Sequence, residues 1–125
     1  MAGVKRFQDL VAWQRAMALA KAVYLLTRQL PDAERFGLVQ QIRRAAVSIP
    51  SNIAEGFGRQ STTDMVRFLR VARGSLFELD TQLRLSTELD MLSPDQVPRS
   101  LIDETDRVLQ GLINSLSPTM EPRSA

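Results

Sequence analysis

The chain contains no cysteine and no histidine among its 125 residues. Without cysteine it can form neither a disulfide nor a thiolate metal site. Without histidine it lacks the common Ser-His nucleophile pair, the histidine ligands of di-iron bundles and the usual general base near neutral pH. These absences exclude most familiar catalytic centres. We therefore expect a protein that is not an enzyme and holds no cofactor.

Long apolar runs are also missing. Apolar residues make up 44% of the chain but occur in short runs, whereas a membrane-spanning helix needs about 20 in succession. The first residues, 1–8, lack the apolar stretch of a secretory signal. The two closest glycines, Gly56 and Gly58, are not followed by the Lys-Ser or Lys-Thr pair of a phosphate-binding loop. We expect a cytoplasmic protein with no membrane association and no small-molecule substrate.

The charged residues are unevenly distributed, although the net charge is only +2. Residues 35–73 carry seven arginines and two acidic residues, whereas residues 74–125 carry four arginines and nine acidic residues. Arginine supplies 14 of the 16 basic side chains. The chain therefore has a basic middle and an acidic C-terminal half.

Apolar residues recur at steps of three and four, which is the period of an amphipathic helix. The first such segment spans about 10–30 and should end at Pro31. The second contains Pro50, whose ring leaves the carbonyl of Ala46 without a donor, so we expect a kinked helix that continues to about Glu55. A glycine of the segment 56–58 should then adopt positive φ as a C-cap.

The third helix should begin at Ser61, an N-cap residue, and run to about Leu89. A fourth should follow Ser93 and become regular only after Pro98. No segment alternates like a strand, and the connections are short. The sequence predicts an all-α fold, an up-down-up-down four-helix bundle, in one domain at 1–117 with a disordered tail at 118–125.

Arginines on the third helix form the clearest candidate binding site. They advance three residues at a time and share one broad face opposite the core row of Leu69, Leu76 and Leu83. Guanidinium groups bind phosphate in pairs of hydrogen bonds and stack on bases. We predict a nucleic-acid surface, for RNA or DNA, made of Arg43, Arg44, Arg67, Arg70 and Arg73. The alternative is a solvated face, or arginines that pair with acids of a neighbouring subunit.

Two further features have structural interpretations. The carboxylates Glu55, Glu78 and Glu104 could meet around a hard cation, but we expect Glu55 to pair with Arg59 and predict no metal site. The wide apolar face of the first helix could pack across two other helices of the same subunit, but in a bundle of this length surplus apolar surface commonly marks a subunit interface, so we expect a homo-oligomer. The interface residues would be Trp13, Tyr24 and Leu26. A second functional hypothesis is a protein-interaction scaffold whose groove receives a partner's helix and binds no nucleic acid.

Residues 41–59 read QIRRAAVSIPSNIAEGFGR. This segment closely resembles the four-helix-bundle proteins encoded within intervening sequences of bacterial 23S ribosomal RNA genes. The resemblance extends to both sides, and its signature positions, to which it gives a structural role, are Ser48, Pro50, Asn52, Glu55, Gly56 and Glu78. Ser48 and Asn52 could also satisfy backbone groups near the proline.

The resemblance implies a left-handed bundle that associates into a closed homopentameric ring and has no agreed catalytic activity. The chain also resembles the accessory proteins of diversity-generating retroelements, whose basic ring surface engages nucleic acid and a reverse transcriptase. The acidic C-terminal half of this chain departs from that basic character. This departure favours the broader group, whose function is unassigned, over a retroelement role.

Overall fold

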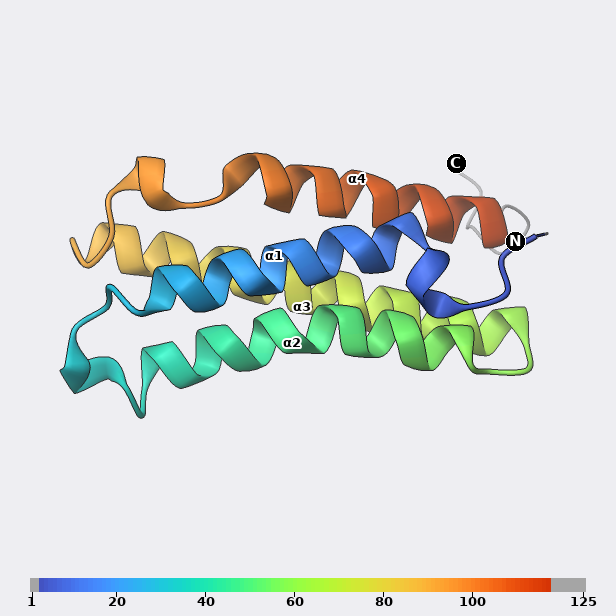
Figure 1. The fold of residues 1–125 in the computed structure, drawn as a ribbon, viewed down its shortest axis with the longest axis horizontal. Helices are drawn as coiled ribbons and strands as arrows, with labels where there is room; N and C mark the ends of the chain where they lie inside the picture. Colours follow the sequence, from blue (N-terminus) through green and yellow to red (C-terminus); the bar gives the residue numbers. More distant parts are fainter. Residues whose placement is uncertain (1–2, 118–125) are drawn as a thin grey trace, which may run out of the picture.

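The computed structural model describes residues 3–117, and their regular structure consists of four long helices joined by short segments. The long helices are α1 Val11–Thr27, α2 Leu38–Phe57, α3 Thr62–Glu88 and α4 Arg99–Leu116. Of three 3-10 helices, η1 Phe7–Asp9 precedes α1, whereas η2 Asp32–Glu34 and η3 Pro94–Gln96 lie in the connections from α1 to α2 and from α3 to α4. Each long helix runs antiparallel to the next along the chain (Figure 1). The predicted all-α four-helix bundle is confirmed.

The helices follow one another around the bundle in chain order. Helix α1 packs against α2 and α4, and α3 packs against the same two helices. Helices α1 and α3 are therefore diagonal partners. It follows that the groove between α1 and α2 and the groove between α3 and α4 lie on opposite sides of the molecule. The left-handed winding of the bundle stays a prediction.

The core contains apolar residues from all four helices, at the spacing that the sequence predicts. The core row predicted for α3 is almost wholly buried, and Leu69, Leu76, Leu79 and Leu83 are each 0% exposed. Facing them are Leu19 and Val23 of α1, Ile42, Ile49 and Ile53 of α2, and Leu109 and Ile113 of α4. Among residues 3–117, no helix is both long and apolar enough to cross a bilayer.

Helix α1 ends earlier than the sequence predicts. It stops at Thr27 rather than at Pro31, because the backbone tightens before the proline is reached. The amide of Gln29 donates to the carbonyl of Leu26, and the amide of Leu30 donates to that of Thr27, each one residue short of the α-helical spacing. Helix starts were predicted better: the Ser61 hydroxyl accepts from the Asp64 amide at 3.0 Å, and α4 begins directly after Pro98.

Helix α2 continues through Pro50 as one element and ends at Phe57, so the predicted continuity is confirmed and the kink angle stays a prediction. The predicted left-handed glycine cap is wrong. Gly58 caps the helix at a φ of −78°, where its amide still reaches the carbonyls of Ala54 and Glu55. Gly56 has a different role: a Cβ there would lie 3.0 Å from the Cβ of Phe68, so the missing side chain lets α3 approach.

Candidate functional surfaces

The five arginines that the sequence groups together do not form one patch. Arg43 is turned towards α1, where its Nε donates to the Thr27 hydroxyl at 2.8 Å. Its guanidinium carbon lies 4.6 Å from the ring centroid of Tyr24, and its Nη2 donates to the Tyr24 carbonyl at 3.4 Å. Arg43 therefore fastens α2 to α1.

Arg44 is exposed on α2, and within the described part of the chain it makes no ion pair. The register between α2 and α3 is given by the contact between Ser48 and Ser75, whose hydroxyl oxygens are 2.8 Å apart. Arg44 lies one turn before Ser48 on α2. Because α3 runs antiparallel to α2, that turn lies level with the residues that follow Ser75, whereas Arg67 and Arg70 precede Ser75. Arg44 is thus separate from Arg67, Arg70 and Arg73.

Three of the four arginines of α3, Arg67, Arg70 and Arg73, do share one surface. Arg67 pairs with Asp64 at 3.2 Å, and Arg73 pairs with Asp106 of α4 at 2.8 Å. Arg70, which is exposed, lines a hollow with Arg67 on one side and a second hollow with Arg73 on the other. These residues make up a continuous strip, which we call the α3 arginine strip.

Aromatic rings lie against the arginines of the strip, and these contacts were not predicted from the sequence. The guanidinium carbons of Arg59 and Arg67 lie 4.5 Å and 4.9 Å from the ring centroid of Phe68. Further along, that of Arg73 lies 4.6 Å from the ring centroid of Phe77. The available signals were the adjacency of Arg67 and Phe68 and the one-turn spacing of Arg73 and Phe77. Stacking of this kind holds the guanidinium planes in place.

The second hollow is a cleft between α3 and α4, with a volume of about 410 Å³. It combines charged, aromatic and amide side chains, which the spacing of residues on one helix could not reveal. Its lining consists of Arg70, Arg73, Gly74, Phe77, Gln110 and Ile113.

The carboxylates considered as cation ligands are engaged elsewhere or lie apart. Glu55 accepts from Arg59 at 2.7 Å, as predicted, and Glu104 pairs with Arg15 at 3.0 Å. Glu78 is exposed on α3. Across residues 3–117 no three His, Cys, Asp or Glu side chains gather closely enough to hold a metal ion.

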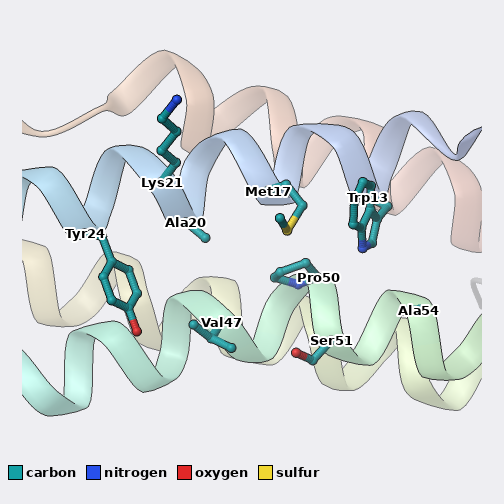
Figure 2. Close-up of a pocket in the computed structure, with 9 residues that line it drawn as sticks. All are labelled: Trp13, Met17, Ala20, Lys21, Tyr24, Val47, Pro50, Ser51 and Ala54. Atoms are coloured by element: carbon teal, nitrogen blue, oxygen red, sulfur yellow. The ribbon is translucent and has the colours of Figure 1, made fainter. Parts of the chain in front are cut away.

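A largely apolar groove lies between α1 and α2, and Figure 2 shows it in close-up. Its volume is about 430 Å³. Met17 and Tyr24 of α1 and Val47 of α2 keep 40–44% of their surface exposed. Lys21 points away from α2, which leaves the floor apolar. The full lining is Trp13, Met17, Ala20, Lys21, Tyr24, Val47, Pro50, Ser51 and Ala54.

The three predicted interface residues have different positions. Trp13 and Tyr24 line the groove, and Trp13 packs edge-on against Phe7 with ring centroids 5.4 Å apart. Leu26 was wrongly predicted to lie at an interface, because it is only 7% exposed and belongs to the core. The helical period places Leu26 and Tyr24 too far apart around α1 to share one outer face.

Most signature positions are packed between α2 and α3 or border the groove. The Asn52 side-chain amide donates to the carbonyl and the hydroxyl of Ser48, at 2.8 Å and 3.0 Å. Gly56 gives α3 its close approach, and Pro50 forms part of the groove.

The comparisons with known proteins agree with this architecture. Three chains of solved structures match, one of them a protein of unknown function from the S23 ribosomal protein family of Bacteroides thetaiotaomicron VPI-5482. It is 24% identical, with a TM-score of 0.75 over 86% of this chain and 98% of that one, which shows a shared fold. No curated protein matches. Residues 8–114 match the family described as the 23S rRNA-intervening sequence protein, and the chain therefore belongs to that family.

Proposed function

We propose that the chain is a non-catalytic bundle that assembles with copies of itself and binds nucleic acid, RNA in the first place, through the α3 arginine strip. The observation that carries the binding proposal is the stacking of Arg67 on Phe68 and of Arg73 on Phe77. Guanidinium planes held in this way are pre-organised for the paired hydrogen bonds that phosphate accepts.

The ion pairs of the strip do not stand against this proposal. Arg67 and Asp64 are both substantially exposed, with 63% and 46% of their side-chain surfaces accessible. Exposed pairs contribute only about 0–1 kcal/mol, and salt screens them. A polyanion that offers several phosphates can therefore displace Asp64 at little cost. The pair of Arg73 and Asp106 is less exposed, at 34% for each side chain, but it engages only the Arg73 Nε and can stay in place while the other guanidinium nitrogens bind phosphate.

The α1–α2 groove supports the assembly part of the proposal. Its floor is apolar, and Met17, Tyr24 and Val47 are exposed in the single subunit. Exposed apolar patches of this kind mark contact surfaces. The family resemblance makes the expected assembly a closed ring of five subunits.

Assembly is tested by light scattering after size exclusion. Changing Val47 to Arg places a charge in the groove and should reduce the mass to that of a monomer. Leu85→Arg is the matched control, because Leu85 is similarly exposed, at 46%, but lies outside the groove on α3. A monomeric wild-type protein would contradict the proposal.

Nucleic-acid binding is tested by fluorescence anisotropy with a labelled RNA at several salt concentrations. Replacing Arg67, Arg70 and Arg73 by Gln should weaken binding and flatten the dependence of log K on log salt. The slope should fall by about 0.7 for every phosphate of a single strand that the variant no longer neutralises. A charge-matched control replaces Arg28, Arg35 and Arg107, exposed arginines outside α3.

Equal losses of affinity in the two triple variants would mean that net charge, rather than the strip, drives binding. A wild-type oligomer that binds no RNA at low salt would overturn the nucleic-acid proposal. It would move the assignment to the protein scaffold, in which the apolar groove receives a partner's helix.

A further inference from the structure

The cleft between α3 and α4 offers chemistry that a phosphate-binding strip does not need. Phe77 is 46% exposed although it is one of the largest apolar side chains of the protein. The Arg73 guanidinium lies over one face of the ring, with its carbon 4.6 Å from the centroid, and Asp106 holds the Arg73 Nε at 2.8 Å. Within the described region, no other hydrogen bond or ion pair engages the guanidinium nitrogens of Arg73. An aromatic face and free guanidinium donors therefore stand next to each other.

The opposite wall of the cleft comes from α4. There the Gln110 side-chain amide donates to Asn114 at 2.7 Å. In residues 3–117 nothing donates to the Gln110 carbonyl oxygen, which leaves one hydrogen-bond acceptor beside the aromatic face. Base edges carry N–H donors, among them the N3–H of uracil, that such an acceptor can bind.

Gly74 opens the cleft. It lies in the middle of α3, where glycine is the least favoured residue after proline. A Cβ at Gly74 would meet nothing within 4 Å, so packing does not demand the glycine. With no side chain there, the space between Arg70 and Phe77 stays open. The volume of about 410 Å³ falls in the range of small-molecule sites, about 300–1,000 Å³.

From these features we infer that the α3–α4 cleft is a nucleotide subsite for single-stranded nucleic acid, an inference that rests on the proposed function. One unstacked base lies against Phe77, while Arg70 and Arg73 hold the adjoining phosphate. Duplexes keep their bases stacked inside, so they reach the arginines but cannot fill the cleft. The cleft therefore gives a preference for single strands, whereas the strip alone gives none.

The test compares binding of a short oligouridine with binding of an RNA duplex of the same length, by anisotropy on the full chain. Gly74→Leu fills the cleft and leaves every charge in place. Because leucine favours helix more than glycine does, unfolding cannot explain a loss of binding. Gly111→Leu is the matched control, since Gly111 is also helical and also meets nothing within 4 Å, but does not line the cleft.

We expect Gly74→Leu to weaken oligouridine binding roughly tenfold, the loss typical of one stacked base, while duplex binding stays unchanged. Phe77→Leu should weaken oligouridine binding at least as much, and should weaken duplex binding by a smaller factor because it also removes the ring that supports Arg73. Phe77→Tyr should retain wild-type binding because it keeps an aromatic face. Gly111→Leu should bind both ligands like the wild type.

Four outcomes would overturn the subsite. If Gly74→Leu and Phe77→Leu bind oligouridine like the wild type, the cleft is unused and the proposed function still stands. Equal losses of affinity for both RNA forms would assign the effect to the strip. Displacement of oligouridine by equimolar uridine monophosphate would assign the cleft to a free nucleotide. Wild-type protein that binds neither RNA would instead remove the proposed function, and the subsite with it.

Discussion

Ser48 of α2 and Ser75 of α3 share a hydrogen bond across the largest helix contact of the bundle, with their hydroxyl oxygens 2.8 Å apart. Asn52 extends this contact, because its side-chain amide donates to the Ser48 hydroxyl at 3.0 Å. Ser75 is only 9% exposed. A polar group that is satisfied in one alignment of two helices and unsatisfied in others specifies their register.

Removing one hydroxyl should therefore destabilise the fold. We expect Ser75→Ala to lower the free energy of unfolding by about 1 kcal/mol. A double-mutant cycle with Ser48→Ala should give a coupling energy of at least about 0.5 kcal/mol, because the two hydroxyls act on each other. Urea denaturation followed by circular dichroism measures both. Ser115→Ala, at an exposed position, is the control, and strictly additive effects of the two core substitutions would refute the coupling.

Gly56 should tolerate no side chain. An added Cβ would stand 3.0 Å from the Cβ of Phe68 and 3.1 Å from the carbonyl oxygen of Met65, and neither atom can move without moving α3. We expect Gly56→Ala to lower the free energy of unfolding by about 1–3 kcal/mol, the usual cost of overpacking. Gly74→Ala is the control and should raise it by up to about 1 kcal/mol, because that position is open and helical. Thermal unfolding that ranks the two variants in the opposite order would contradict the packing argument.

The helices and the core residues could be predicted because each of these predictions uses a pattern that lies within one helix. The row from Leu69 to Leu83 follows the helical period, and Ser61 and Pro98 act within one turn of the boundaries that they define. The end of α1 was harder to place. Pro31 prevents the helix from continuing past it, but the helix already ends at Thr27, and the spacing of apolar residues does not indicate that earlier end.

The candidate site was less predictable, because its contacts join residues far apart in the chain. Arg43 binds Thr27, sixteen residues earlier, and Arg73 binds Asp106, thirty-three residues later. A periodic pattern shows which face of a helix is polar but not which neighbour that face meets. The prediction of Leu26 as an interface residue failed for the same reason, because a wide apolar face does not show which of its residues lie in the core and which line an exposed groove.

Arg43 should matter for stability and not for nucleic-acid binding. Its guanidinium stacks on Tyr24 and its Nε donates to Thr27, so Arg43→Ala removes a link between α1 and α2. We expect a loss of about 1–2 kcal/mol in the free energy of unfolding. Arg43→Lys should recover only part of it, because lysine lacks the planar fork. Unchanged stability together with weaker RNA binding would return Arg43 to the binding surface.

Asp80 should make stability depend on acid pH. The hydrogen bond from Arg99, opposed by partial burial, lowers the pKa of the Asp80 carboxyl below its usual value. A carboxyl whose folded-state pKa is depressed adds stability above its unfolded pKa, about 3.9, and loses that stability as the pH falls through the folded value. Asp80→Asn should lower the free energy of unfolding near neutral pH by no more than about 1 kcal/mol, because half of the Arg99 side chain is exposed and solvent screens the pair.

The difference between Asp80→Asn and the wild type should vanish below the folded pKa. Chemical denaturation across the acid range measures this convergence. Asp95→Asn is a useful comparison, because the pKa of Asp95 is also lowered, chiefly by a hydrogen bond from Ser93, and no cationic group among residues 3–117 contributes to that shift. A constant gap between Asp80→Asn and the wild type at all pH values would show that packing, and not ionisation, is what the substitution changes.

Replacing Asp90 should stabilise the protein. This residue follows the C-cap of α3 at a φ of 60°, and the next amide, of Met91, donates back to the carbonyl of Ser86 at 2.9 Å. The pattern is a Schellman cap, in which the left-handed position favours glycine. The carboxylate also lies at the negative end of the helix dipole. Asp90→Gly relieves both effects, and we expect a gain of about 0.5–1 kcal/mol in the free energy of unfolding. Asp90→Asn removes only the charge, so its thermal stability at low salt should lie between those of the wild type and of Asp90→Gly. If Asp90→Asn were more stable than Asp90→Gly, backbone strain at this position would be absent.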